Sequence, residues 1–200
     1  MLTPPIPIPS PLIAEKVFLT RGVGVHKRKL ASFEMALRNA NIAEFNLVRV
    51  SSIYPPRAQL VSKNEGLKVL KPGQVVFCVI SDAATDEPAR RIAASVGIAR
   101  PVDRTRYGYL SEHHSFGETG KQAGDFSEDL AAEMLGSTMG LDINIDKAWD
   151  ERKGIYRFPK NIIKTQNITA SATGDLRGLW TTCLAACLFV MSSKNANKNG

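Results

Sequence analysis

Two adjacent serines, Ser51 and Ser52, end a short apolar-alternating segment and are followed closely by Pro55 and Pro56. If the Ser52 hydroxyl attacks the carbonyl of Ser51, the peptide bond rearranges to an ester. Loss of the Ser52 α-proton then breaks the ester, cuts the chain and leaves a dehydroalanine that hydrolyses to a pyruvoyl group. The prolines impose extended geometry on the residues next to the pair. This segment could therefore make a carbonyl cofactor from the backbone itself.

The serine pair alone leaves two interpretations open. Adjacent serines are common turn residues, and a turn would carry no chemistry. Self-cleavage needs strain or a hydrogen-bond donor for the oxyanion that forms on the Ser51 carbonyl. Asn46 is a candidate donor, because residues 46 and 52 differ by an even number and would share one face of an extended strand.

The run from Asn46 to Pro56, NLVRVSSIYPP, resembles the processing site of pyruvoyl-dependent arginine decarboxylases. The helix pattern that begins at Leu30, the run GYLSE at 108–112 and the apolar segment at Cys183 are similar to further parts of that family. The resemblance spans most of residues 17–190. It implies a layered α/β/β/α sandwich with mainly antiparallel sheets, and a homotrimer with active sites between subunits.

Residue by residue, the resemblance implies cleavage between Ser51 and Ser52. The products would be a β chain of residues 1–51 and an α chain of residues 52–200. Ser52 would become the pyruvoyl group, a covalently bound cofactor. Asn46 would support the processing step.

The same resemblance implies roles in the reaction. Glu112 would donate the proton in decarboxylation, for which its carboxyl must hold a proton near neutral pH. The substrate-binding positions would be Glu34, Leu30, Ala43 and Phe45. Glu34 replaces the family's usual aspartate, which keeps the charge that holds a guanidinium and places it one methylene farther out.

The expected reaction converts arginine to agmatine and carbon dioxide. Two alternatives remain open at this point. The departures at Glu34, Ala43 and Phe45 leave room for decarboxylation of another amino acid. An unprocessed, non-enzymatic relative that acts as a binding subunit is the other alternative.

Composition favours one cytoplasmic globular domain. Of the 200 residues, 44% are hydrophobic and 22% are charged. Cys78, Cys183 and Cys187 lie in apolar segments without metal-ligand spacing, which predicts reduced core thiols and no metal site. The net charge of +7 includes the basic cluster 26–29, but no aromatic platform accompanies it, so no nucleic-acid partner is expected. The apolar run 179–191 is too short to span a membrane.

Hydrophobic periodicity predicts a β-rich chain with two principal helices. Strands are expected at residues 17–20, 45–50, 74–80, 93–99, 106–112, 162–172 and 179–190. One helix is expected from Leu30 to Ala40. The strands and helices do not alternate regularly, so an α+β fold is favoured over a doubly wound sheet.

Several local features complete the prediction. Gly22 and Gly24 are expected in a loop after the first strand. A polar loop at residues 115–124 is expected to lead to the second helix, with acidic residues from Asp125 in its first turn. Residues 1–12 are expected to form a Pro-rich arm, and residues 192–200 a disordered tail.

Overall fold

The computed structural model describes most of the chain, namely residues 11–140, 149–150, 155–158 and 161–191. The expected tail at 192–200 and all but the last two residues of the expected arm at 1–12 lie outside the described residues. Among the helices that are described, none is both long and apolar enough to cross a membrane.

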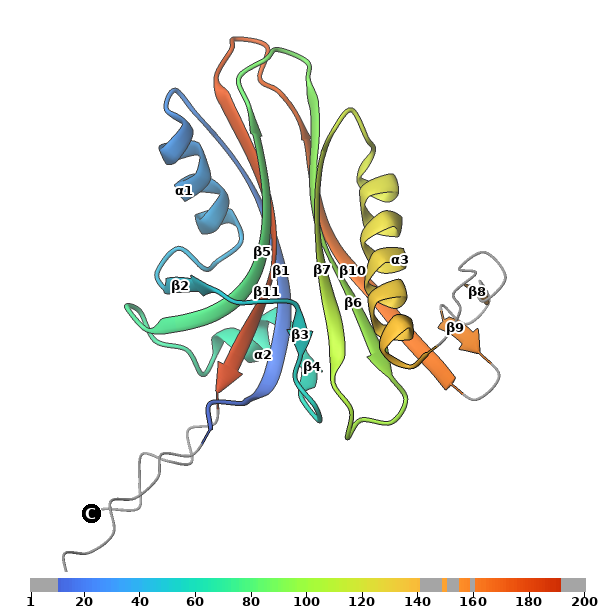
Figure 1. The fold of residues 1–200 in the computed structure, drawn as a ribbon. Coiled ribbons are helices and arrows are strands. Elements are labelled where there is room, and N and C mark those ends of the chain that lie inside the picture. The colour runs from blue at the N-terminus through green and yellow to red at the C-terminus, as the bar shows by residue number, and fades with distance from the viewer. Residues whose placement is uncertain (1–10, 141–148, 151–154, 159–160, 192–200) are drawn as a thin grey trace, which may run out of the picture.

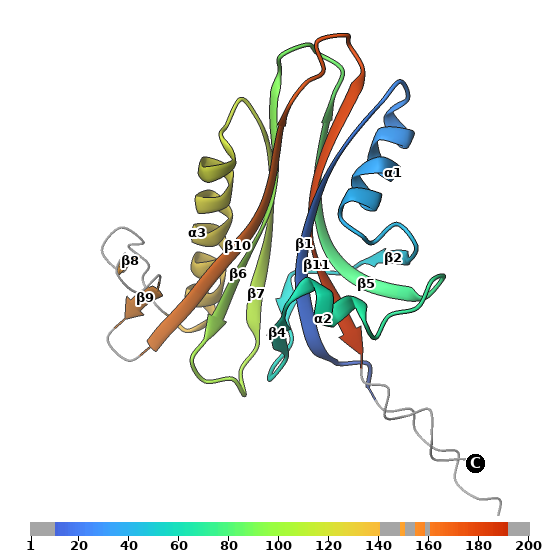
Figure 2. The same cartoon turned by 180° about the vertical axis from the view of Figure 1, so that it is seen from behind.

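The described strands form two sheets that face each other, and a helix covers the outer face of each (Figures 1 and 2). Sheet A has the order β2 (Asn46–Arg49), β5 (Val75–Thr85), β11 (Trp180–Met191), β1 (Ala14–His26) and β4 (Gln59–Val61). Sheet B has the order β3 (Ile53–Tyr54), β7 (Gly108–Phe116), β6 (Arg91–Pro101), β10 (Asn161–Thr173), β9 (Ile155–Phe158) and β8 (Trp149–Asp150).

Helix α1 (Lys29–Asn39) packs on β1 and β11 of sheet A, and α3 (Gly120–Thr138) packs on sheet B. The short α2 (Lys63–Leu67) lies beside β1. Neighbouring strands are antiparallel except for the pairs β2–β5 and β1–β4, which are parallel. The predicted α/β/β/α sandwich with mainly antiparallel sheets is therefore confirmed.

Apolar side chains fill each of the three spaces between these layers. Val79, Val96, Leu110 and Cys187 lie between the two sheets. Strand β11 is buried along almost its whole length because it lies at the centre of sheet A with apolar layers on both sides. This position explains why its sequence is almost continuously apolar rather than alternating.

The first strand is longer than predicted, and the loop expected at Gly22 and Gly24 is wrong. Both glycines lie inside β1, beneath α1. A Cβ on Gly22 would lie 2.1 Å from the carbonyl oxygen of Ala36, and a Cβ on Gly24 would lie 2.2 Å from that of Ser32. The two glycines therefore allow a helix backbone to approach the strand, a role that has the same sequence signal as a turn.

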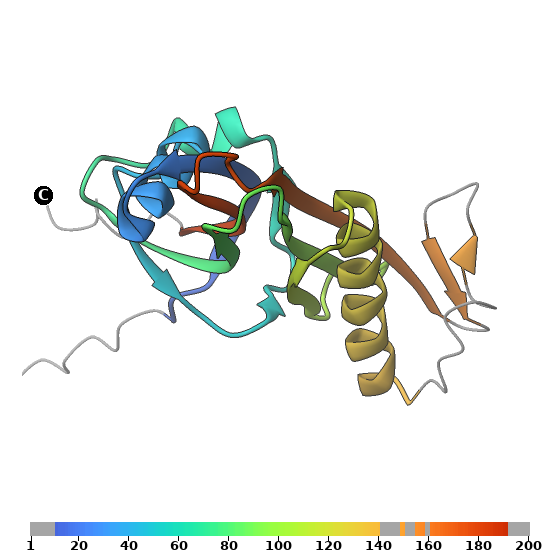
Figure 3. The ribbon, with the colours of Figure 1, turned by 90° about the horizontal axis from the view of Figure 1, so that it is seen from above.

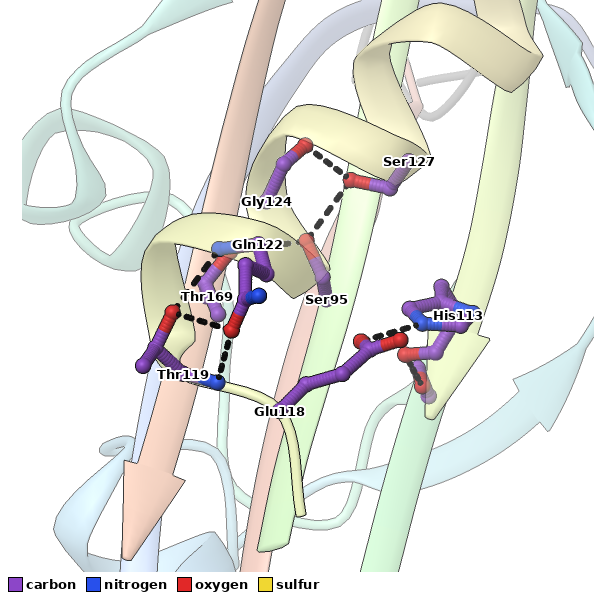
Figure 4. Close-up of polar contacts among 9 residues, drawn as sticks. Ser95, His113, Glu118, Thr119, Gln122, Gly124, Ser127 and Thr169 are labelled. Atoms are coloured by element: carbon purple, nitrogen blue, oxygen red, sulfur yellow. Dashed lines mark hydrogen bonds and ion pairs between the residues drawn. The ribbon is translucent and has the colours of Figure 1, made fainter. Parts of the chain in front are cut away.

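The second helix begins within the segment predicted to be a loop. Thr119 caps it: its Oγ1 accepts a hydrogen bond from the Gln122 N–H at 3.2 Å, and the Gln122 Oε1 accepts one from the Thr119 N–H at 2.9 Å (Figure 4). This reciprocal capping box sets the start of α3. Asp125, Glu128 and Asp129 consequently lie in later turns, and the expectation of an acidic first turn is wrong.

Hydroxyl groups fasten α3 to sheet B. Ser127 Oγ lies 2.7 Å from Ser95 Oγ, which lies 2.7 Å from Thr169 Oγ1 (Figure 4). A Cβ on Gly97 of β6 would lie 2.1 Å from the Ser127 carbonyl oxygen, so the helix backbone nearly touches the strand. Close approach and a paired hydroxyl chain make this helix a fixed layer of the sandwich.

Candidate functional site

The Ser51–Ser52 bond lies where the chain leaves one sheet and joins the other. Strand β2 is the edge of sheet A, and β3 is the edge of sheet B. The chain passes directly from the first edge to the second, as Figures 1 and 3 show. Only residues 50–52 separate the two strands. The reacting bond predicted from the sequence is thus a short link between two β-sheets.

Backbone hydrogen bonds hold both ends of this link. The Val50 N–H donates to the Cys78 carbonyl oxygen of β5 at 3.0 Å. On the other side, the Leu110 N–H of β7 donates to the Ser52 carbonyl oxygen at 2.7 Å. The link is therefore attached to sheet A before the serine pair and to sheet B at its second serine.

A third hydrogen bond lies inside the link. The Ile53 N–H donates to the Ser51 carbonyl oxygen at 3.0 Å, which closes a three-residue turn centred on Ser52. This carbonyl is the one that the Ser52 hydroxyl would attack. A donor at about 3 Å is suited to stabilising an oxyanion that develops there. The donor was not predicted from the sequence, because a backbone N–H has no residue signature.

Glu112 lies near this bond. It follows Leu110 by two residues on β7, a distance of roughly 7 Å along a strand. Its Oε1 accepts a hydrogen bond from the Ile80 N–H of β5 at 3.2 Å, so the side chain reaches from sheet B to sheet A. Ile80 lies two residues beyond Cys78, where β2 has already turned away from β5. The exposed Glu112 side chain thus spans from β7 to β5, two residues along β7 from the residue that binds Ser52.

Two more charged residues lie near the serine link and were missed in the sequence. Arg49, at the end of β2, forms an ion pair with Asp82 of β5. Burial raises the pKa of the Cys78 thiol to about 11, while Arg49 opposes that rise and Glu112 adds to it. Both charges therefore act within the same small region. The signal in the sequence that could have marked this pair is the single charged residue in each strand, Arg49 in β2 and Asp82 in β5.

An apolar pocket of about 400 Å³ opens beside Ser51. The other residues that line it, among those described, are Leu12, Ile13, Ala14, Val50, Ile53, Pro55, Pro56, Phe77, Phe189 and Met191. Such a pocket shields part of a bound molecule from water, which favours the loss of charge when a carboxylate departs as carbon dioxide.

Asn46 lies at the far end of β2 from the serine pair. Its Nδ2 donates to the Gly73 carbonyl oxygen at 2.8 Å. At a strand rise of about 3.3 Å per residue, Ser51 is about 16 Å away. One chain does not bring the Asn46 amide to its own processing bond.

The four predicted substrate-binding residues lie on α1 or just after it, on the outer side of sheet A (Figure 1). Leu30 is 80% exposed, and Glu34 pairs with Arg38, with 2.7 Å between Oε1 and Nε. Ala43 is half-buried, and Phe45 packs in the core between α1 and sheet A. A single chain does not bring these side chains to its own serine pair.

His113 points to the opposite face of β7 from Glu112, as alternation along a strand requires. Its Nε2 lies 2.9 Å from Glu118 Oε2 (Figure 4), and its ring lies 4.3 Å from that of Phe126. The hydrogen bond from His113 lowers the pKa of the Glu118 carboxyl. The pair connects β7 to the residues before α3.

All three cysteines are free and buried, which confirms the prediction of core thiols. Burial raises the pKa of the Cys183 thiol to about 12. Within the described ranges, His, Cys, Asp and Glu side chains do not gather in a group of three or more that could hold a metal ion.

Comparisons with known proteins agree with this geometry. The family model for pyruvoyl-dependent arginine decarboxylase matches residues 16–194. The chain is 52% identical over 180 residues to the pyruvoyl-dependent arginine decarboxylase of Nitrosopumilus maritimus, which covers 90% of this chain and 98% of the relative. It is 51% identical over 180 residues to that of Methanococcoides burtonii, covering 90% and 100%, respectively. The chain belongs to the pyruvoyl-dependent arginine decarboxylase family.

Proposed function

We propose that this chain cuts itself between Ser51 and Ser52 and then decarboxylates arginine to agmatine. The observation that carries the proposal is the link between the sheets, where the Ser51 carbonyl oxygen accepts a hydrogen bond from the Ile53 N–H at 3.0 Å. The names of the relatives support arginine as the substrate.

Processing would begin when Ser52 Oγ attacks the Ser51 carbonyl carbon. The C–O bond forms, the peptide C–N bond breaks, and the hydroxyl proton passes to the freed amine. The Ile53 N–H would stabilise the intermediate oxyanion. Loss of the Ser52 α-proton then expels the Ser51 carboxylate and leaves dehydroalanine. Water converts this residue to a pyruvoyl group and releases ammonia, which completes chains 1–51 and 52–200.

The surroundings of Ser52 fit a pyruvoyl group. Its amide carbonyl would be the present Ser52 carbonyl, whose oxygen already accepts a hydrogen bond from Leu110. The pairing of Ile53 with Tyr109 would keep the new terminus on sheet B. When present, the group supplies the electron sink for decarboxylation.

Glu112 is the proposed proton donor to the former α-carbon of the substrate. Its side chain reaches from sheet B to sheet A, where Oε1 accepts a hydrogen bond from the Ile80 N–H. The position beside the serine link suits proton delivery at that point.

Glu34 is proposed to bind the substrate guanidinium, with Leu30, Ala43 and Phe45 shaping that side of the pocket. The ion pair with Arg38 supports this role, because Glu34 already accepts a guanidinium donor in a 2.7 Å contact. These residues lie away from the serine pair of their own chain, so the assignment requires a site formed between chains. We therefore propose a homotrimer, in which Asn46 also acts across the subunit contact during processing.

The proposed location is the cytoplasm, since three buried free thiols suit a reducing compartment. A second candidate function is decarboxylation of a different amino acid. It is favoured by the longer side chain of Glu34, which stands where the family usually has aspartate.

Intact mass measurement and a substrate panel test the proposal. The purified protein should contain two fragments divided after Ser51, with a blocked amino terminus on the larger. Carbon dioxide release from labelled arginine should exceed release from ornithine, lysine and histidine. A single uncut chain would overturn self-processing, and faster release from another amino acid would select the second candidate. Sedimentation at the mass of three protomers would support the trimer.

A further inference from the structure

A second pocket, of about 430 Å³, lies across Pro55 from the serine link, and its size is typical of small-molecule sites. Five of the described residues that line it are cationic, and none is acidic. The five are Arg57, Arg100, Arg104, Arg106 and Lys164. This concentration of positive charge is unfavourable without a counter-ion, so a bound anion would stabilise the pocket.

Strand register places two of these cations side by side. Lys164 of β10 stands directly opposite Arg100 of β6 in the antiparallel ladder. Directly opposed residues project on the same face of a sheet, and like charges there destabilise the pairing. Among the residues that the structure describes, neither cation has an ion-pair partner. The fold therefore keeps two like charges side by side in the lining of the pocket.

One nitrogen of the Arg100 side chain lacks an acceptor among the described residues, although the guanidinium also interacts with the Tyr54 hydroxyl. Its guanidinium carbon lies 5.6 Å from the centroid of the Tyr54 ring, and its Nε is buried without a hydrogen-bond partner in the described part of the chain. A buried donor without an acceptor costs free energy. An oxygen atom of a bound anion would supply the missing acceptor.

The Arg104 side chain, unlike that of Arg100, donates its hydrogen bonds to backbone carbonyl oxygens. Its Nη2 donates to the carbonyl oxygens of Arg57 at 3.2 Å and Ala58 at 3.1 Å, and the Arg57 N–H donates to the Arg104 carbonyl oxygen at 2.8 Å. These bonds join the β3–β4 connection to the β6–β7 turn. They hold Arg57 at a φ of 62°, which is uncommon for a residue with a side chain. The rim of the pocket is thus fixed, and four other cations line it. Of these, Arg106 also lies near the Asp103 carboxylate, whose pKa is lowered by hydrogen bonds from Thr105 and by the charge of Arg106.

We propose that this pocket binds a small anion that carries two or more phosphate groups. A phosphate monoester carries about −1.5 to −2 charges near neutral pH and a diphosphate about −3 in total, so one diphosphate offsets most of the charge of four cations. Guanidinium groups match phosphate oxygens in bidentate geometry. A single carboxylate would leave most of the cations unpaired.

The source of the phosphate groups is either a free diphosphate or a nucleotide. Leu60, Pro101 and Val102 form an apolar part of the lining, which offers a surface for a nucleoside. Pro55 lines both this pocket and the apolar pocket beside Ser51. An occupied anion pocket would therefore hold the segment that follows Ser52 against sheet B.

Calorimetric titration of the purified, processed protein tests this proposal, with pyrophosphate, adenosine diphosphate and adenosine as probes at equal ionic strength. We expect saturable binding of pyrophosphate and of the nucleotide, and none of adenosine. Tighter binding of the nucleotide than of pyrophosphate would identify a nucleotide source, and equal binding a free diphosphate. The exposed side chain of Lys164 permits a mild variant. Lys164→Gln should weaken pyrophosphate binding about tenfold or more, whereas Lys68→Gln, the same charge change at another exposed lysine, should not.

Thermal melting supplies a second measurement. Pyrophosphate should raise the melting temperature of the parent protein and hardly change that of Lys164→Gln. Without any anion, Lys164→Gln should melt slightly higher than the parent because the opposed cations are separated. Absence of saturable binding would overturn the proposal, as would equal binding by the Lys164 and Lys68 variants. Loss of oligomers in Lys164→Gln without loss of anion binding would assign the pocket to a subunit contact instead.

Discussion

The chain passes between the sheets at the serine link and again at the opposite end of the sandwich, where residues 86–90 join β5 to β6 and residues 174–179 join β10 to β11 (Figure 1). The two far connections bond to each other: the Gly174 N–H donates to the Arg90 carbonyl oxygen at 2.7 Å, and the Ala89 N–H donates to that of Gly174 at 3.0 Å. The serine link instead bonds to the strands on either side of it.

This difference decides how much stability the domain would lose if one of the crossings were cut. A break in either far connection would free a loop whose hydrogen bonds depend on the other loop. A break between Ser51 and Ser52 leaves Val50 on β5 and Ser52 on β7, because each side keeps its own strand partner. The domain should therefore stay folded after a cut in this crossing, because each of its ends is hydrogen-bonded to a different strand.

The most decisive test of this difference between the crossings is the variant Ser52→Ala. Without the Ser52 hydroxyl, the link should stay uncut and activity should be lost, so denaturing electrophoresis should show one chain of 21.8 kDa. Ser51→Ala is the matched control, since it retains the attacked carbonyl and should still be cut. Cleavage of the Ser52→Ala chain at this bond would refute the proposed attack.

Glu112→Gln should separate processing from turnover. We expect cleavage to proceed and kcat to fall by about 10²- to 10⁴-fold, the usual contribution of a positioned proton donor. The control is Glu133→Gln, an exposed carboxylate on α3. Steady-state kinetics on processed protein measure the effect, and an unchanged kcat would remove Glu112 from the mechanism.

Glu34→Ala tests whether the helix on sheet A serves a serine link in another chain. Loss of a charged hydrogen-bond partner for the guanidinium should raise KM for arginine by about 10- to 100-fold, with normal cleavage. Arg38→Ala removes the partner that competes for the same carboxylate and should not raise KM. Equal loss of cleavage and binding in Glu34→Ala would contradict the assigned role.

Asp175→Asn perturbs the far crossing, with the smallest expected effect. Hydrogen bonds from Arg177 lower the pKa of the Asp175 carboxyl, so its contribution to stability is present above its unfolded pKa of about 3.9 and is lost as pH falls below that value. The variant should therefore melt slightly lower than the parent at pH 7, and the two should converge near pH 3. Calorimetry checks this, and processing should be unaffected.

Sequence patterns identified the family and the central strands, because motifs and apolar runs are local. They failed where one residue type serves two purposes, as at Gly22 and Gly24, and where a cap decides a boundary, as at Thr119. The opposition of Arg100 and Lys164 was not predictable either, since strand register depends on the whole sheet. Even spacing along one strand places Asn46 and Ser52 on the same face of the strand. It does not bring them close together, since Asn46 and Ser51 are already about 16 Å apart.

The place of β1 in sheet A determines what would happen to the small fragment after the proposed cleavage. This strand belongs to residues 1–51, yet it pairs with β11 on one side and β4 on the other, and both of those belong to residues 52–200. The interface between the two proposed products would thus be the hydrophobic core of the original domain, like that of an obligate heterodimer. We expect the fragments to stay together and to unfold in one cooperative transition, so that the cut changes the covalent structure of the protein while the domain remains whole.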